Sequence, residues 1–163
     1  WTAADAVRRA AMLQPFDLYW LEEPLPQQDI GGHVRLRTAV PIPIAVGENL
    51  YTKHEFSEYL RSGAVDIIHT DVCRVGGITE WMKVAHLAEA HNLPVTSHGV
   101  HDLHVHLLAA VPNASYLEAH GFGLERYLAE PLQIVAGEAI APDRPGHGVS
   151  FDWDALARLR ESP

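Results

Sequence analysis

The chain has 163 residues, a formal net charge of −9 at pH 7, and 47% hydrophobic and 20% charged residues. Acidic residues outnumber basic ones by 21 to 12 without a basic block, which argues against a nucleic-acid binder. No apolar run approaches the ~18 residues of a membrane span, and one cysteine, Cys73, excludes an internal disulfide. We therefore expect a cytoplasmic protein with neither a nucleic-acid nor a membrane partner.

The first 63 residues alternate helix and strand signals. Two helix starts are marked by a threonine with an acid three residues on, Thr2 with Asp5 and Thr52 with Glu55. The second of these helices is expected to end at Gly63. The other elements predicted here are a strand at 18–21, a weak helix at 33–39 and a strand at 42–46.

Residues 64–98 form the clearest unit, in which strands at 64–70 and 95–97 flank a helix with Thr79 as the expected N-cap. Asp71 follows the first strand and His98 follows the second. Parallel strands joined by a right-handed crossover are usually neighbours, about 4.8 Å apart, so these two side chains are expected side by side. A carboxylate beside an imidazole fixes its tautomer, and the pair is either a general base or a structural ion pair.

The segment after His98 predicts a helix around 103–110 and a last strand at 115–117, ending at Glu118. Beyond residue 121 the pattern changes to a short strand at 130–135 with a turn, and a terminal helix at 151–160. We therefore expect two parts, residues 1–125 with the strand-end polar groups and a tail, residues 126–163, that packs outside them.

Polar residues recur at the ends of the five predicted strands: Glu22, Glu48, Asp71, His98 and Glu118. Alternating strands and helices predict a parallel sheet covered by helices. Functional groups at one end of every strand favour part of a (β/α)₈ barrel over a doubly wound sheet, which concentrates its signal at one glycine-rich loop. Because a barrel takes about 250 residues, we expect the C-terminal part of a larger enzyme, with two open sheet edges if it folds alone.

Glu22 and Glu48 are expected on adjacent strands, where two unpaired carboxylates repel. They are either solvated rim acids or ligands of a hard cation, and oxygen ligands suit Mg²⁺. A cation beside the Asp71–His98 pair predicts removal of the proton next to a substrate carboxylate, with His98 as base. Glu118 is either a protonated acid that donates to that carboxylate or a partner for a nearby cation.

The histidines and the single cysteine raise the question of other chemistry. Histidines at 98, 101, 104 and 106 crowd one segment at a spacing that zinc sites use. No cysteine joins them and the later ones fall on an apolar helix, so packing roles are favoured over zinc. Cys73 is expected to be a small buried residue rather than a nucleophile.

Several segments resemble the mandelate racemase and muconate lactonizing enzyme family of the enolase superfamily. They are Trp20–Pro24, Val46–Asn49, Asp71 with Arg74–Thr79, Ser97-His98, and Glu118. The resemblance implies a TIM-like (β/α) barrel whose N-terminal strands and capping domain are missing from this chain, and a tail that packs against that capping domain. It implies that the opposite base, a Lys-x-Lys pair, and a third metal ligand lie outside these 163 residues.

The resemblance also implies roles for individual residues. Glu22 and Glu48 are implied as Mg²⁺ ligands, and Asp71 with His98 as the acid/base dyad. Glu118 is implied as the electrophilic acid. Three further residues are implied to support this set without binding the cation: Glu23, Asn49 and Arg74.

These features together predict a Mg²⁺-dependent enzyme that dehydrates an acid sugar. A 2-hydroxyacid racemase or epimerase is the alternative within the same chemistry, and a non-catalytic truncated barrel module is the alternative outside it. The expected partners are a small carboxylate substrate and further copies of the chain in a homo-oligomer.

Overall fold

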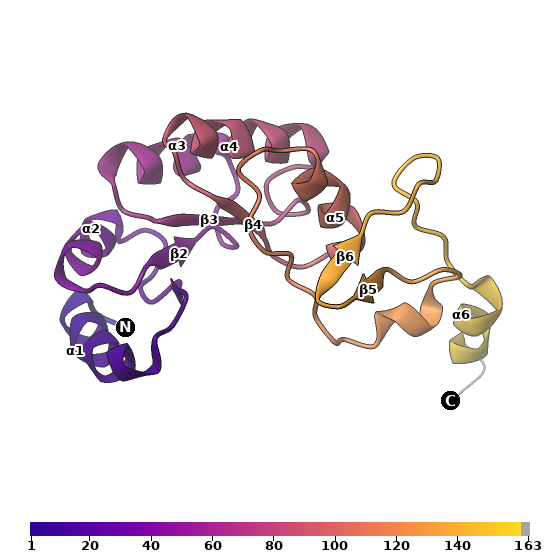
Figure 1. Ribbon diagram of the computed structural model, residues 1–163, viewed down its shortest axis with the longest axis horizontal. Helices are drawn as coiled ribbons and strands as arrows, with labels where there is room; N and C mark the ends of the chain where they lie inside the picture. The colour runs from indigo at the N-terminus through magenta and orange to yellow at the C-terminus, as the bar shows by residue number, and fades with distance from the viewer. Residues whose placement is uncertain (161–163) are drawn as a thin grey trace.

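The computed structural model describes residues 1–160 and contains a four-stranded parallel sheet (Figure 1). Its strands run in the order β1-β2-β3-β4. This order follows the chain without reversal, as in a barrel, whereas a doubly wound sheet reverses direction. The strands are β1 (Leu21–Glu22), β2 (Ile44–Val46), β3 (Ile67–Thr70) and β4 (Val95–Ser97).

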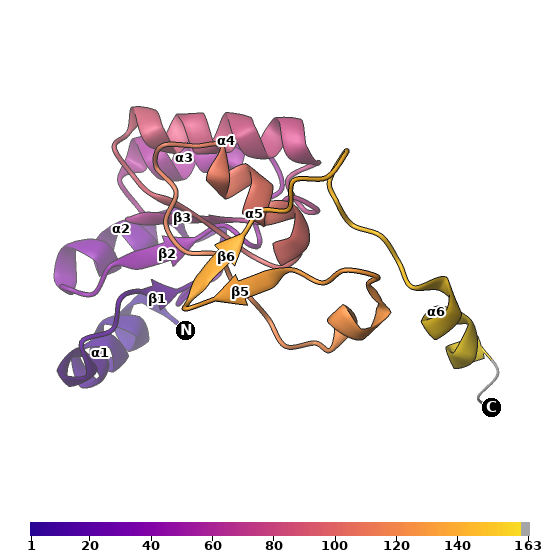
Figure 2. The same ribbon diagram turned by 45° about the vertical axis from the view of Figure 1, so that its right-hand side comes forward.

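The helices between the strands lie along one face of the sheet, as Figures 1 and 2 show for α2, α3 and α4. They bury a continuous core against the strands, with Phe56 and Trp81 fully inaccessible to solvent. Every residue of β2, β3 and β4 is buried, which is typical of parallel sheets. The helices of this part are α1 (Ala3–Leu13), η1 (Gln14–Phe16), α2 (Ile30–Ala39), α3 (Lys53–Ser62), α4 (Ile78–Ala90) and α5 (His101–Ala109).

The predicted caps of α1 and α3 are confirmed. The Thr2 hydroxyl accepts the Asp5 N–H, and Thr52 and Glu55 form a full capping box. Gly63 ends α3 with φ of 68°, a left-handed conformation that glycine adopts without strain. The Gly63 cap therefore fixes the end of α3 and the start of the loop that leads into β3.

Several predicted boundaries are wrong. The helix predicted at 33–39 begins at Ile30, because the Asp29 side chain caps it by accepting the Gly32 N–H. The strands predicted at 42–46 and 64–70 begin later, at Ile44 and Ile67. The N-cap of α4 is Gly77 rather than Thr79, because Gly77 adopts φ of 104° and its N–H donates to the Val72 carbonyl. The loop that Gly77 closes also leaves Cys73 exposed instead of buried. The strand predicted at 18–21 is shorter and later, since only Leu21 and Glu22 pair with β2.

The fifth strand, predicted at 115–117, is not a regular strand. The segment makes a single parallel bridge, Ala114 with Val95, and Ser115 N–H donates to the Val95 carbonyl over 2.8 Å. Asn113 anchors it by donating to the carbonyls of Ala85 and Leu93. The segment therefore runs beside β4 and still brings Glu118 to the end of the sheet.

The tail contains an antiparallel hairpin where one strand and a turn were predicted. Ala136 and Gly137 have φ of 53° and 85°, the pattern of a tight two-residue hairpin turn. The tail's elements are η2 (Leu124–Tyr127), β5 (Gln133–Val135), β6 (Glu138–Ile140) and α6 (Trp153–Arg160). The last three residues of the predicted 126–163 part lie outside the described residues, and the division at residue 126 stays a prediction. Among the described helices, none is long and apolar enough to cross a membrane.

Candidate active site

The carboxyl ends of the four parallel strands carry the side chains that the sequence singles out. Glu22 ends β1, Glu48 lies two residues beyond β2, and Asp71 and His98 directly follow β3 and β4. Gly47 permits this arrangement, because a Cβ atom at this position would lie 2.5 Å from the His69 carbonyl oxygen. The close approach of β2 and β3 therefore depends on a glycine immediately before Glu48.

Asp71 and His98 form a hydrogen-bonded pair, as predicted from their positions at neighbouring strand ends. His98 Nδ1 lies 2.8 Å from Asp71 Oδ2. Asp71 Oδ1 accepts the backbone N–H groups of Cys73 and Arg74, over 2.7 and 3.3 Å. The aspartate side chain is 8% exposed and the histidine 25% exposed. The carboxylate is thus held rigidly, and it fixes the histidine proton on Nδ1, so that Nε2 is the nitrogen available for proton transfer.

Glu48 lies against the other nitrogen of the same histidine. His98 Nε2 is 2.9 Å from Glu48 Oε2, and the amide of Asn49 donates to Glu48 Oε1 over 3.0 Å. The same amide group donates to Glu23 Oε2 over 2.6 Å, and the Arg74 guanidinium donates to the Asn49 side-chain oxygen over 2.9 Å. This chain of polar contacts connects Glu48 to Glu23 and Arg74.

Glu23 is turned away from the strand end, toward the backbone of the β2–α3 loop. Its Oε1 atom accepts the N–H groups of Gly47 and Asn49, each over 3.2 Å. The carboxylate therefore accepts three N–H groups, counting the Asn49 side chain, and stabilises the loop that carries Glu48. Its backbone φ of 36° is in the left-handed region, which turns it away from the direction of Glu22.

Glu22 contacts a histidine that the sequence interpretation left without a role. His69 Nδ1 lies 3.3 Å from Glu22 Oε1, and His69 Nε2 lies 2.7 Å from the Ser97 carbonyl oxygen, which accepts a hydrogen bond from it. Contact with the His69 ring lowers the pKa of Glu22, against the raising effect of burial. Burial lowers the pKa of His69, but Glu22 and the Ser97 carbonyl raise it by more, so the net shift is upward.

Glu118 lies at the edge of this group, bound to the loop that follows His98. Gly99 N–H donates to Glu118 Oε2 over 2.7 Å, and Glu118 N–H donates to the Ser97 hydroxyl over 3.0 Å. A Cβ atom at residue 99 would approach Asp71 Oδ2 to 3.1 Å. Gly99, with φ of 70°, therefore allows one tight turn to contact both acids.

The donor set at the strand ends fits a hard divalent cation. Glu22 and Glu48 lie at the carboxyl ends of adjacent strands, and their side chains are 38% and 26% exposed. In the described part of the chain, no three His, Cys, Asp or Glu side chains converge as a metal site. These two glutamates are the residues here that could hold such a cation, and alone they would supply only some of the oxygen ligands that Mg²⁺ takes.

The zinc alternative for the histidine segment finds no support in residues 1–160. His104 is fully buried, accepts the Val72 N–H at Nε2 over 3.0 Å, and has Nδ1 2.9 Å from the Val100 carbonyl. Both nitrogens are thus engaged within the core, and burial lowers the pKa of His104. His106 Nε2 faces the His147 carbonyl instead of another ligand. His104 is a packing residue, as the apolar helix pattern indicated.

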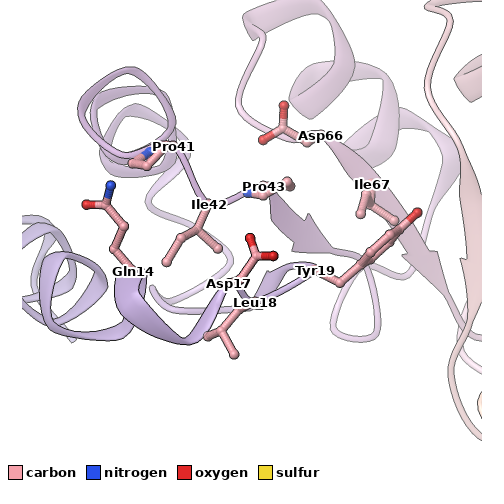
Figure 3. Close-up of a pocket in the computed structure, with 9 residues that line it drawn as sticks. All are labelled: Gln14, Asp17, Leu18, Tyr19, Pro41, Ile42, Pro43, Asp66 and Ile67. Atoms are coloured by element: carbon pink, nitrogen blue, oxygen red, sulfur yellow. The ribbon is translucent and has the colours of Figure 1, made fainter.

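A cavity of about 690 Å³ lies at the opposite end of the sheet (Figure 3). Its lining includes Leu18, Pro43 and Asp66, which precede β1, β2 and β3. Figure 3 shows the Asp66 carboxylate at the upper edge of the lining residues and the Asp17 carboxylate among them. Asp66 accepts from the Arg37 guanidinium over 2.6 Å. In barrels the chemistry occurs at the carboxyl ends of the strands, so this cavity is not the candidate active site.

Comparison with known proteins identifies the family. A family model described as enolase C-terminal domain-like matches residues 1–155. The chain belongs to the mandelate racemase and muconate lactonizing enzyme family of the enolase superfamily. It is 50% identical over 159 residues to the 3,6-anhydro-alpha-L-galactonate cycloisomerase of Streptomyces coelicolor, covering 98% of this chain and 44% of that protein.

Two solved enolase-superfamily structures show the same fold. A racemase from Streptomyces coelicolor with bound magnesium has a TM-score of 0.92 and 48% identity, over 98% of this chain and 44% of that one. An L-talarate dehydratase from a Polaromonas species, complexed with Mg and L-glucarate, has a TM-score of 0.88 and 38% identity, over 96% and 44%. The chain spans less than half the length of the curated relatives it matches.

The sequence interpretation gave no role to two neighbours of Glu22 at the candidate site, His69 and Trp20. Each lies two residues before a recognised acid, His69 before Asp71 and Trp20 before Glu22. Because side chains two apart along an extended chain point to the same side, this spacing was the available signal. Of the predicted residues, Glu22, Asp71 and His98 end or directly follow a strand. Glu48 lies two residues beyond β2, and Glu118 follows a segment that makes a single bridge to β4.

Proposed function

We propose that the protein carrying this chain is a Mg²⁺-dependent enzyme that removes the proton α to the carboxylate of an acid sugar. The observation that carries the proposal is the position of His98. One ring nitrogen is held by Asp71 over 2.8 Å and the other lies 2.9 Å from Glu48. The proton-accepting nitrogen is therefore adjacent to a carboxylate suited to hold the cation.

Glu22 and Glu48 are the residues of this chain that would hold Mg²⁺. When bound, the cation neutralises the negative charge that develops on the substrate carboxylate as the α-proton leaves. Glu23 and Asn49 orient Glu48 through the amide contact of 3.0 Å, and Arg74 fixes Asn49. These support roles follow from the polar chain of contacts that ends at Glu48.

His98 performs both proton transfers in the proposed reaction. Nε2 takes the α-proton, so the C–H bond breaks, an N–H bond forms, and the electron pair enters the enediolate of the substrate. Asp71 stabilises the resulting imidazolium. As the β C–O bond breaks, the imidazolium returns its proton to the departing oxygen. Glu118 is the acid assigned to the substrate carboxylate.

The fate of the β-oxygen distinguishes two outcomes of the same first step. If the oxygen is a hydroxyl, it leaves as water and the reaction is a dehydration. If it belongs to a ring of the same molecule, it stays attached and the product is an isomer. The dehydratases among the relatives and the cycloisomerase that is 50% identical support these two outcomes. Dehydration is the outcome predicted from the sequence.

The test is incubation of a panel of acid sugars and anhydro sugar acids with the intact protein and Mg²⁺ in D₂O. A product lighter by one water identifies a dehydratase, and a product of unchanged composition identifies a cycloisomerase. Return of both epimers with deuterium at Cα would identify the racemase alternative. The absence of both exchange and product across the panel would contradict the proposal and favour a non-catalytic module.

A further inference from the structure

Each carboxylate oxygen of Glu22, a proposed Mg²⁺ ligand, lies beside a ring nitrogen of another residue. The indole Nε1–H of Trp20 donates to Glu22 Oε2 over 3.4 Å. His69 Nδ1 lies 3.3 Å from the other oxygen, Oε1. The indole donates whatever the pH, because a tryptophan N–H does not titrate in the working range. Trp20 is therefore the neighbour whose effect on Glu22 can be isolated.

The Trp20 ring is itself held in place by rings from three other positions. Its centroid lies 5.4 Å from that of Tyr19, 6.2 Å from that of His69 and 6.1 Å from that of Tyr116. His69 belongs to β3, and Tyr116 belongs to the segment that runs beside β4. Contacts at such distances orient aromatic rings, so the direction of the indole N–H is set by the sheet.

We propose that Trp20 is a positioning residue of the candidate active site, which fixes the Glu22 carboxylate in the orientation that binds Mg²⁺. The inference rests on the proposed function, because it takes Glu22 as a ligand of the cation. Partners that orient metal ligands typically contribute 10- to 100-fold to metal affinity. The long 3.4 Å bond places Trp20 at the lower end, about tenfold.

The experiment is a calorimetric titration of the intact protein with Mg²⁺ alone, comparing wild type with Trp20→Phe. Phenylalanine keeps an aromatic ring at the position and removes the N–H. Trp153→Phe is the matched control, since Trp153 is 72% exposed on α6, outside the site. We expect the Mg²⁺ dissociation constant to rise about tenfold for Trp20→Phe and to stay within twofold for Trp153→Phe.

The outcomes separate this inference from the proposed function. Trp20→Phe that binds Mg²⁺ within twofold of wild type, with a wild-type melting temperature, overturns the role of Trp20 and leaves the function standing. Wild-type protein that does not bind Mg²⁺ overturns the function itself. If Trp20→Phe fails to fold, benzothienylalanine is placed at position 20 instead, because that residue keeps both fused rings and has no N–H. Unchanged Mg²⁺ affinity in that variant would overturn the inference.

Discussion

Replacing Asp71 with asparagine should disable His98 without moving it. Asp71 Oδ1 accepts two backbone N–H groups, from Cys73 and Arg74, whereas Oδ2 faces His98 Nδ1 at 2.8 Å. In Asp71→Asn the amide oxygen keeps the two backbone donors, so the NH₂ group turns toward the histidine. His98 Nδ1 must then accept a hydrogen bond, and its proton moves to Nε2. The nitrogen that faces the substrate loses the electron pair needed to take the α-proton.

The magnitude follows from the tautomer. The same substitution in Ser-His-Asp enzymes lowers kcat about 10⁴-fold by imposing the wrong tautomer, equivalent to about 5.5 kcal/mol of activation free energy. We expect kcat to fall about 10³- to 10⁴-fold in Asp71→Asn and KM to change little, measured by product formation and by loss of the substrate α-proton signal in D₂O.

The matched control is Asp66→Asn, at the amino end of the same strand. Asp66 accepts bonds from the Arg37 side chain and the Ile44 N–H, over 2.6 and 2.9 Å, and lies at the end of the sheet away from His98. We expect that variant to lose stability and retain its kcat. Asp71→Asn that keeps more than a tenth of wild-type kcat while folding normally would refute the reasoning about the tautomer.

Three further predictions follow from single contacts. Glu22→Gln or Glu48→Gln should each weaken Mg²⁺ binding at least about 100-fold in calorimetry, because losing a ligand lowers metal affinity more than losing a residue that orients it. Unchanged affinity would exclude that residue as a ligand. Gly47→Ala should lower the free energy of unfolding by about 2–4 kcal/mol in urea titrations, because its Cβ would lie 2.5 Å from a β3 carbonyl oxygen. The control is Gly121→Ala, which has open space around it and should leave the free energy of unfolding nearly unchanged. Burial lowers the pKa of His104 below its unfolded value, so its contribution to stability is present above about pH 6.5 and falls with acidification. His104→Gln should therefore reduce the acid-induced loss of unfolding free energy, by at most about 1.4 kcal/mol per pH unit. An unchanged dependence of the unfolding free energy on pH would contradict this.

The sequence was sufficient to predict the dyad because strand ends obey a simple geometric rule. Asp71 and His98 each follow a strand directly, and neighbouring parallel strands place such residues side by side, as the 2.8 Å contact confirms. The Thr52–Glu55 capping box was equally predictable, because both of its hydrogen bonds depend on local spacing alone. Local rules and a single pairing rule therefore reach the fold class and the centre of the site.

What the sequence could not supply depends on contacts between distant segments. The strand predicted at 115–117 has suitable residues, but Asn113 ties the segment to carbonyls of Ala85 and Leu93, and the segment makes one bridge to β4. The orientation of Trp20 toward Glu22 depends on rings from β3 and from the segment around Tyr116. Neither arrangement follows from the propensity or periodicity of a single stretch of chain.

The most direct test of the central claim follows the α-proton of an acid sugar by NMR in D₂O with Mg²⁺, comparing wild type with His98→Asn. The account predicts that wild-type protein replaces or removes this proton and that the substitution abolishes the reaction while Mg²⁺ binding and folding persist. Exchange at the wild-type rate in His98→Asn would show that another group takes the proton, and the assignment of the Asp71–His98 pair would be wrong.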